Sequence, residues 1–437
     1  MDAQRRKNLC KYVIPTVLSS VSYFLFTIVD GIFVGRGVGT NALGAVNIAF
    51  PFVMVVCAAF MLTTIGGVTV VAIRLGRGDA KGANAAFMHS LSLTAGIAVL
   101  LFLAGTLLTD GICTLLGAND TFFDYVHDYI FWYSVFIIPS GFSTAMSGFA
   151  RNDGSPVLVS AAVIIGTTCN IFGDWLLIFP FKMGLRGAAI ATGVSQTLTL
   201  LIVLVHFAKK RGSLRVSRFS PDKELYKKIA LRGTPEFIAQ LAAPISITAT
   251  NYVLLARVGD IGVNAFSIIG YVASFSVAIF FGTAEGLQPM FGRCYGAKNE
   301  TDLKYYFRAG LLINIIGSII IYILLFPVAT PICTIFGAEP ETLQYTVSSM
   351  PKYAWGFSVM AANTIISAYL YSTKRSKQAI IMNILRSFVF DLSVIILLPM
   401  LLGTEAVWYT FGVYELLVLA AAVYLLRRSE KGGVKFI

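Results

Sequence analysis

Long apolar runs alternate with short polar segments along the whole chain. Twelve of these runs are long enough to cross the hydrocarbon core of a bilayer, which is about 30 Å thick and needs about 20 helical residues. Backbone groups in lipid must be satisfied internally, and the runs are too long for barrel strands, so we predict transmembrane helices. The predicted spans are 12–34, 43–73, 85–109, 125–150, 156–180, 186–208, 233–256, 264–291, 305–328, 345–371, 377–402 and 405–427.

The composition agrees with this pattern. Hydrophobic residues make up 57% of the 437 positions and charged residues 13%, with a mean hydropathy of +0.77. Soluble domains carry about a quarter charged residues, so the composition excludes a soluble domain. The basic N-terminus runs into the first apolar segment without a small-residue cleavage site, which indicates a retained first span. The sequence therefore predicts an all-α integral membrane protein.

The charges orient the predicted spans. When the N-terminus is placed in the cytoplasm, most Lys and Arg residues fall on the cytoplasmic side, and the opposite side carries acids such as Asp110 and Glu341. Nine of the 34 basic residues lie in one connection, 209–232. This positive-inside asymmetry predicts a multi-pass protein of the bacterial cytoplasmic membrane with both termini inside. It also accounts for the net charge of +12, so no nucleic-acid partner is expected.

The second half of the chain repeats the first at an offset of 220 residues. "GICTLLGA" at 111–118 matches "PICTIFGA" at 331–338, and Gly39 matches Gly259. Later the offset becomes 219, where Pro180 matches Pro399. Each half holds six spans, an even number, so the halves have the same topology and form parallel repeats.

The repeat divides the chain into three predicted parts. These are an N-terminal six-helix lobe with a cation site at 1–208, a basic cytoplasmic linker at 209–232 and a C-terminal six-helix lobe at 233–437. Two six-helix bundles suit alternating access by rocking of one lobe against the other.

Acidic residues inside the predicted spans are the candidate functional groups. Asn170 and Asp174 are four residues apart in the fifth span, so they share one helix face. Together with Asp30 of the first span they offer carboxylate and amide oxygens for a hard cation or an exchangeable proton. The alternative is an interhelical hydrogen bond that only holds spans together. The acids are not repeated in both halves, which favours specialised chemistry.

The second half carries further polar groups. Glu285 and Gln288 lie in the eighth span, where they suit a cationic or hydrogen-bonding solute or, alternatively, a helix-end cluster bound to backbone. Asp391 follows Arg386 by five residues in the eleventh span, and we interpret these two as an internal ion pair. Glu415 of the twelfth span is compatible with either role.

Pro15 lies in the first span, fifteen residues before Asp30. Proline bends a helix, and a bend that responds to the charge of Asp30 would couple ion binding to conformation. The alternative is a static kink, matched by Pro235 in the second half.

Several motifs together resemble the multidrug and toxic compound extrusion (MATE) transporters over nearly the whole chain. They are "SYFLFTIVDGIFVGRGVGTNALGAVNIAFP", "NIFGDWLLIF", "GLRGAAIATGVSQ" and "AEGLQP", the last typical of bacterial members. The resemblance implies export of amphipathic, often cationic compounds in exchange for H⁺ or Na⁺. It assigns the N-lobe cation site to Asp30, Asn170, Asp174 and Thr192, helix bending to Pro15 and substrate or proton handling to Glu285.

The resemblance has one departure. Some members carry a Glu partway along the seventh span, but this chain reads "QLAAPISITATN" there and has no acid. Ion coupling is therefore expected in the N-terminal half. The resemblance also implies a monomer in contact with membrane lipid.

Two other functions have less support in the sequence. A lipid-linked precursor flippase of a related superfamily branch would need several cations for pyrophosphate, and only Arg386 is clearly mid-span. A membrane enzyme finds no support, because the six cysteines and three histidines are scattered and no phosphate loop or nucleophile–base pair is present. No cofactor is expected beyond the coupling ion.

Overall fold

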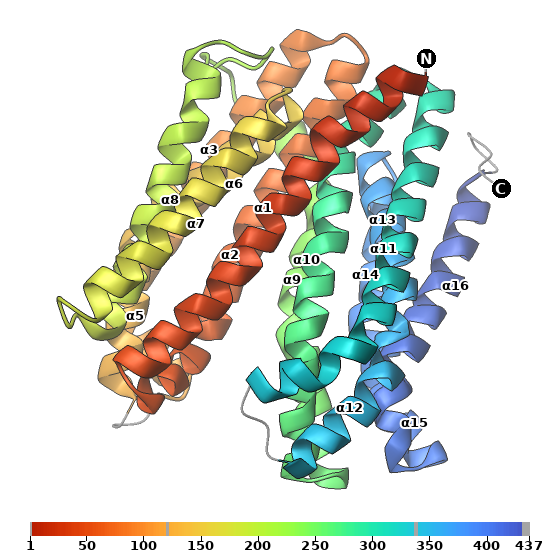
Figure 1. The fold of residues 1–437 in the computed structure, drawn as a ribbon. Helices are drawn as coiled ribbons and strands as arrows, with labels where there is room; N and C mark the ends of the chain where they lie inside the picture. Colours follow the sequence, from red (N-terminus) through yellow and green to blue (C-terminus); the bar gives the residue numbers. More distant parts are fainter. Residues whose placement is uncertain (1, 119–121, 336–339, 431–437) are drawn as a thin grey trace. The chain divides into compact units, whose positions relative to one another are not determined.

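Most of the chain is helical in a computed structural model that describes residues 2–118, 122–335 and 340–430 (Figure 1). It divides into two compact units, residues 1–240 (unit 1) and 241–437 (unit 2). The boundary falls inside one helix, whose first turns pack with unit 1.

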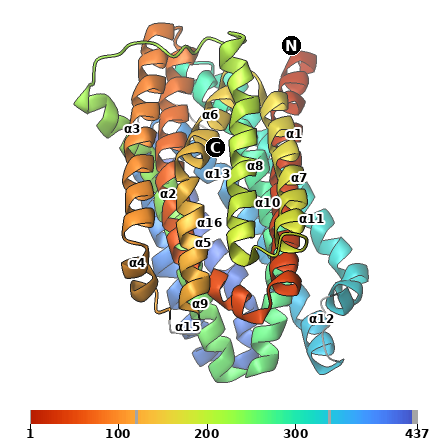
Figure 2. The same ribbon diagram turned by 90° about the vertical axis from the view of Figure 1, so that its left-hand side faces the viewer.

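Unit 1 contains eight helices and the start of a ninth. Their bounds are α1 (Asp2–Gly37), α2 (Thr40–Gly76), α3 (Ala80–Leu107), α4 (Thr109–Leu115), α5 (Phe123–Val135), α6 (Ile137–Asn152), α7 (Pro156–Ile178), α8 (Gly184–Ala208) and α9 (Lys223–Arg257). A core cluster of this unit includes Phe87 of α3 and Phe149 of α6, whose rings meet edge to face with centroids 4.9 Å apart. Figure 2 shows α1, α7 and α8 running alongside one another.

Unit 2 contains the rest of α9 and the remaining elements. Their bounds are α10 (Asp260–Gly296), α11 (Glu300–Ile335), α12 (Pro340–Ala354), α13 (Gly356–Ser372), α14 (Ser376–Ile384), the π-helix η1 (Leu385–Phe390), α15 (Asp391–Leu402), the 3₁₀ helix η2 (Thr404–Tyr409) and α16 (Thr410–Glu430). Its core is built around Phe357 of α13 and Trp408 of η2, both almost completely buried.

Ten helical segments in the described residues are long and apolar enough to cross a membrane, and an eleventh is a pair bent by 53°. The bent pair is α5 and α6, which together make the fourth predicted span; Pro139 lies three residues after the break, where a missing backbone donor favours bending. The tenth predicted span, 345–371, is likewise interrupted, at Trp355 between α12 and α13. α12 has 15 residues and α13 has 17, so neither helix alone reaches the length of about 20 residues that crosses a bilayer.

The backbone turns of the two units follow the sequence offset. Left-handed φ angles occur at Gly39 (117°) and, 220 residues later, at Gly259 (85°), in the turns after α1 and α9. Positive φ angles occur at three more pairs of positions, and glycine is the residue that adopts them without strain. These pairs are Gly78 and Lys298, Gly154 and Lys374, and Gly184 and Gly403.

The two interrupted spans are packed in the same way. A Cβ added to Gly193 of α8 would lie 2.0 Å from the ring of Phe136, the residue at the α5–α6 break. A Cβ added to Gly412 of α16 would lie 2.1 Å from the ring of Trp355, at the α12–α13 break. In each unit a glycine therefore makes room for an aromatic residue at a helix break.

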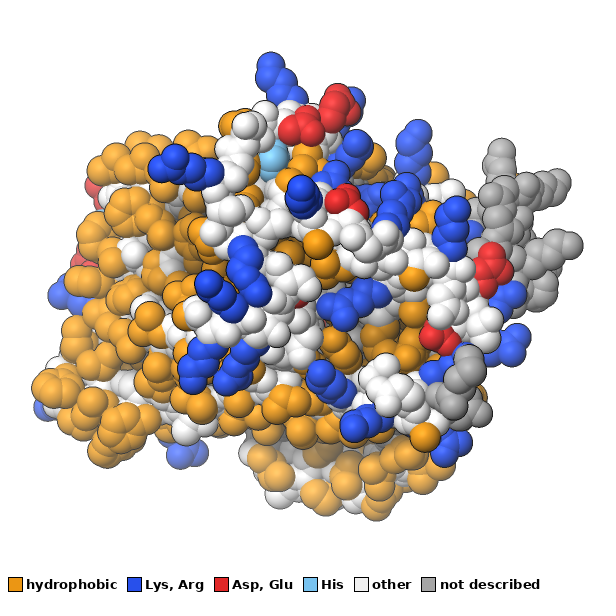
Figure 3. All heavy atoms as spheres, turned by 90° about the horizontal axis from the view of Figure 1, so that it is seen from above, with side chains coloured by type: hydrophobic (Ala, Val, Ile, Leu, Met, Phe, Trp, Pro, Cys, Tyr) orange, Lys and Arg blue, Asp and Glu red, His pale blue; other side chains and the backbone are white. Residues whose placement is uncertain are grey.

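The predicted linker, 209–232, is helical in its second half. Residues 209–222 have no helix, but Lys223–Arg232 form the first turns of α9. Leu225 and Ile229, four residues apart, are buried in the core of unit 1 and explain why this basic segment is helical. Figure 3 views the end of the molecule at which α1 begins, and Lys and Arg side chains are spread over this face.

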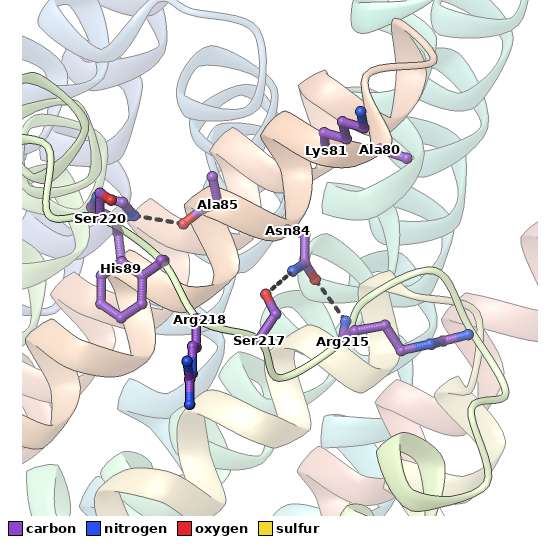
Figure 4. Close-up of a pocket in the computed structure, with 10 residues that line it drawn as sticks. Ala80, Lys81, Asn84, Ala85, His89, Arg215, Ser217, Arg218 and Ser220 are labelled. Carbon is purple, nitrogen blue, oxygen red and sulfur yellow. Dashed lines mark hydrogen bonds between the residues drawn. The ribbon is translucent and has the colours of Figure 1, made fainter.

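The non-helical part of the linker is fastened to the start of α3 (Figure 4). Asn84 accepts a hydrogen bond from the backbone N–H of Arg215 (2.6 Å) and donates one to the Ser217 hydroxyl (2.8 Å). His89 Nε2 accepts from the backbone N–H of Asp222 (2.8 Å), so its Nδ1 carries the proton and donates to the Ala85 carbonyl (2.7 Å). These bonds hold the linker along α3.

A second set of bonds ties the start of the linker to the end of α6. Asp153 accepts from the backbone N–H groups of Ser213 (2.8 Å) and Leu214 (3.0 Å), and it pairs with His206 Nε2 at 3.0 Å. The other ring nitrogen of His206 bonds the Ser155 hydroxyl at 2.8 Å. Burial acts to raise the pKa of the Asp153 carboxyl, but the bonds from His206 and the two amides outweigh it and lower this pKa.

Replacing Asp153 with alanine is expected to release the linker. The variant loses two backbone bonds to a charged acceptor, each contributing about 1.5–3 kcal/mol, so opening of residues 209–222 should increase at least about tenfold. The rate of trypsin cleavage in this segment, which has five Lys and Arg residues, measures the change. Because the pKa of Asp153 is lowered, the bonds hold at neutral pH and weaken only below its ordinary value of about 4.

The control is Asp128→Ala, which removes an exposed ion pair with Arg186 elsewhere in unit 1. It should leave cleavage of the linker unchanged. Equal cleavage in the wild type and Asp153→Ala would show that these bonds do not fasten the linker.

Candidate functional site

Helices α1, α7 and α8 pack closely enough in unit 1 to bring polar side chains together (Figures 1 and 2). Small residues make this approach possible, as is common between helices in membranes. A Cβ on Gly173 of α7 would lie 3.1 Å from the Cβ of Ala191 on α8. One turn from Gly173 on α7 lies Asn170, and next to Ala191 on α8 lies Thr192.

Two carboxyl groups meet in this region. Asp30 of α1 and Asp174 of α7 lie within hydrogen-bonding range of each other. Asp174 is completely buried and Asp30 is half-buried. Among the described side chains, Oδ1 of Asp30 and Oδ1 of Asp174 are buried oxygen atoms without a hydrogen-bond partner. The pair therefore has unused acceptor capacity inside a membrane-spanning bundle.

Asn170 and Thr192 complete the cluster. With its amide in the orientation that satisfies both ends, Asn170 donates to Asp174 Oδ2 at 3.0 Å, and its oxygen accepts from the Thr192 backbone N–H at 3.1 Å. The same oxygen lies 3.3 Å from the Thr192 hydroxyl. The structure thus brings together all four residues that the sequence predicted for the N-lobe site.

The chemistry of the pair follows from its charge. Two ionised carboxylates cannot share such a site without strong repulsion, so a proton or another small cation has to accompany them. The four residues supply carboxylate, amide and hydroxyl oxygens, which are ligands for hard cations. The arrangement can therefore exchange a proton or a cation while changing its charge.

Tyrosines near the carboxyl pair were not singled out from the sequence. Tyr129 of α5 lies close enough to interact electrostatically with both Asp30 and Asp174. Its ring stacks with that of Tyr133 at a centroid distance of 6.2 Å, and Tyr133 hydrogen bonds to Cys57 of α2. The only sequence signal is the four-residue spacing of the two tyrosines, which puts them on one helix face.

Pro15 lies far from the carboxyl pair along α1. Fifteen residues of helix correspond to about 22 Å, and α1 continues through Pro15 without interruption. The Pro15 carbonyl accepts a hydrogen bond from the Ser160 hydroxyl of α7 at 2.5 Å. Pro15 and Asp30 therefore both contact α7, the helix that carries Asn170 and Asp174.

Glu285 and Gln288 belong to α10 in unit 2. Gln288 is buried and its Nε2 donates to the Tyr371 hydroxyl at 3.0 Å, whereas Glu285 is half-buried. They belong to unit 2, whereas the four-residue cluster belongs to unit 1. Their role in substrate or proton handling stays a prediction.

The predicted ion pair between Arg386 and Asp391 is wrong. Arg386 instead pairs with Glu415 of α16, with Nε 2.9 Å from Oε1. Asp391 hydrogen bonds to Ser246 of α9. The sequence showed the spacing of the first two residues along one helix but not the carboxylate that the neighbouring helix supplies.

A cavity of about 440 Å³ lies between the start of α3 and the linker. Lys81, Arg215 and Arg218 line it, but Figure 4 shows their side chains pointing in different directions. The Arg215 guanidinium also donates to the Leu214 carbonyl at 2.7 Å. The described residues contain no group of three or more His, Cys, Asp or Glu side chains that could hold a metal ion. The carboxyl pair of unit 1 is therefore the stronger candidate site.

Known proteins resemble this chain over nearly its full length. Multidrug export protein MepA of Staphylococcus saprophyticus is 23% identical over 438 residues, covering 96% of this chain and 94% of that protein. A FAD transporter of Shewanella oneidensis is 23% identical over 443 residues, covering 98% and 96%. The solved structure of a MATE protein in complex with MaL6 shares the fold, with a TM-score of 0.91 at 21% identity over 97% of this chain and 96% of that one.

The MatE family model matches the chain twice, at residues 15–176 and 235–397. The first match begins at Pro15 and ends two residues after Asp174, so it contains most of the carboxyl site. Since the two matches together make up most of the sequence, the chain belongs to the MatE family of membrane transporters.

Proposed function

We propose that the protein is a secondary active antiporter that exports amphipathic, often cationic compounds in exchange for H⁺ or Na⁺ by alternating access. Family membership supports transport, and the relatives named as multidrug export proteins support export of small foreign compounds. The matched backbone turns and the paired family matches support two duplicated six-span halves.

The observation that carries the proposal is the contact between the carboxyl groups of Asp30 and Asp174. A buried pair of carboxyls that contact each other holds a proton between them or requires a cation. Its charge therefore changes with ion binding, and charge inside a membrane is energetically costly. The site is thus a place where an ion gradient acts on the protein.

The Asn170 amide, in the orientation that satisfies both of its ends, is compatible with a proton shared by the carboxyl pair. Its amide oxygen is occupied by Thr192 and its N–H group points at Asp174. A sodium ion between the carboxylates needs oxygen ligands, and the amide would have to turn to provide one. A proton shared by the two carboxyls needs no such change.

Exchange follows if ion and exported compound favour different conformations. Each then lowers the affinity for the other by the same factor, as thermodynamic linkage requires. The contacts of α1 with α7 at both Pro15 and Asp30 allow a change at the carboxyl pair to reach the other end of α1. We also propose that the protein is a monomer in the bacterial cytoplasmic membrane with both termini inside. The basic linker and the basic N-terminus support this orientation.

A lipid-linked precursor flippase receives no support from the charges. Arg386 is the mid-span cation that would bind pyrophosphate, but Glu415 neutralises it. A compound with phosphate groups would have to displace a buried carboxylate whose Oε1 accepts two hydrogen bonds from the guanidinium.

Purified protein in liposomes tests the proposal. Vesicles loaded with ethidium, an amphipathic fluorescent cation, are placed in an inward H⁺ gradient or an inward Na⁺ gradient, each imposed alone. We expect one gradient to accelerate ethidium export several-fold over the rate without a gradient, with protein-free vesicles as the control. Export that responds to neither gradient would contradict ion coupling.

A further inference from the structure

Unit 2 contains a π-helical turn inside the eleventh predicted span of the chain, 377–402. The helix changes from α to π at Leu385–Phe390 and returns to α at Asp391. The backbone N–H of Asp391 donates to the carbonyl of Arg386, five residues earlier. π turns are rare, and they occur frequently at functional sites.

The π turn changes which side chains face each other. In an α-helix, residues five apart point about 140° away from each other, because each residue turns the helix by about 100°. A hydrogen bond between residues five apart instead stacks them on nearly the same side. Arg386 and Asp391 are therefore brought to one face of the span, which the α-helical pattern of the sequence does not predict.

The Arg386 charge is already matched. Its guanidinium donates to Glu415 Oε1 from Nε at 2.9 Å, and Asn363 of α13 donates to Glu415 Oε2 at 2.7 Å. Glu415 and Asn363 are completely buried. The Glu415 carboxylate thus has partners at both oxygens, and the ion pair is electrically neutral.

Asp391 stands beside this pair without a cation of its own. Its side chain is 3% exposed, and its hydrogen bond goes to the Ser246 hydroxyl. In the described part of unit 2 no ion pair reaches Asp391, and its Oδ1 atom has no hydrogen-bond partner. The charged or titratable groups that interact with it are Arg386 of η1, Glu415 and Tyr414 of α16, and Tyr353 of α12.

We propose that Asp391 is a proton-binding site of unit 2, separate from the carboxyl pair of unit 1. With Arg386 and Glu415 cancelling each other, an ionised Asp391 would leave one uncompensated negative charge in a membrane span. Binding one proton to its free oxygen removes that charge and breaks no other bond. The protonated group keeps its contact with Ser246.

The same geometry gives the ionised form a partner. The π turn places Arg386 on the same side as Asp391. When Asp391 loses its proton, its carboxylate becomes a second anion beside the Arg386 guanidinium. Arg386 then bridges Glu415 and Asp391. Gain or loss of this proton therefore changes the contacts between η1 and α16.

Infrared difference spectroscopy on the purified full-length protein tests the proposal. Spectra at neutral pH are compared between wild type and Asp391→Asn, which preserves size and hydrogen bonding. We expect the variant to lose the carbonyl band of one protonated carboxyl group per chain. Loss of a carboxylate band instead would show that Asp391 is ionised and would overturn the proposal.

Two further variants keep the result interpretable. Asp124→Asn removes an exposed acid and should lose a carboxylate band, which calibrates the measurement. Ser246→Ala retains Asp391 and should shift its protonated carbonyl band to higher frequency, so it tests the site if Asp391→Asn does not fold. An unshifted spectrum for Ser246→Ala would contradict the assignment. The spectra do not depend on transport, so their result tests the Asp391 site whether or not the proposed antiport is correct.

Discussion

Asp174→Asn should reduce ion-driven export about a hundredfold, which corresponds to the upper range of typical coupling energies between two ligands. The substitution leaves Asp30 as the sole carboxyl of the pair. An asparagine cannot change its charge, and it replaces the shared proton by a permanent amide hydrogen bond. The ion gradient then has little differential effect on the two conformations.

The measurement is ethidium export from liposomes with and without the effective gradient. Asp124→Asn is the matched control, because it removes an exposed acid of α5 outside the site. Elution as a single folded species in detergent shows that the variant is intact. Gradient-driven export by Asp174→Asn at the wild-type rate would place ion coupling outside the unit 1 site.

Gly412→Val should destabilise the protein by about 3 kcal/mol, the upper range for overpacking. A Cβ at Gly412 would lie 2.1 Å from Trp355, and the indole is held at the break between α12 and α13. Gly193→Val should have a similar effect, since its Cβ would lie 2.0 Å from Phe136. A valine side chain at either position would have to displace the ring that fills this space.

Denaturation of the purified variants in detergent measures this effect. Gly96→Val is the control, because a Cβ at this exposed position of α3 meets nothing within 4 Å. Gly96→Val should change the stability by less than about 1 kcal/mol. If Gly412→Val were as stable as Gly96→Val, the glycine would not be needed for the aromatic contact.

Much of the fold could be predicted from the apolar pattern, because each span must be long enough for the bilayer and its ends are polar. The pattern did not predict the breaks at Phe136 and Trp355, since both residues are apolar and the helix resumes at once. It also did not predict that α9 begins at Lys223, because the basic residues there obscure Leu225 and Ile229, which are buried on one face.

The site was predictable only where residue type and spacing were enough. Asp30, Asn170 and Asp174 stood out as polar residues in the spans, and the resemblance added Thr192. Tyr129 was missed because an aromatic residue in a membrane helix is ordinary, and only the packing of α5 shows that it lies near the carboxyl pair. The partner of Arg386 was missed because a π turn and a second helix determine it.

Two of the turn residues with positive φ affect the orientation of the protein in the membrane. Where the first half has Gly78 and Gly154, the second half has Lys298 and Lys374, and all four have a positive φ. A side chain there costs about 1–2 kcal/mol relative to glycine. Both lysines lie in connections assigned to the cytoplasm, where positive charge opposes inversion of the protein. At these two positions a lysine favours the cytoplasmic orientation of the connection but strains the backbone of the turn. The sequence has the lysine at both.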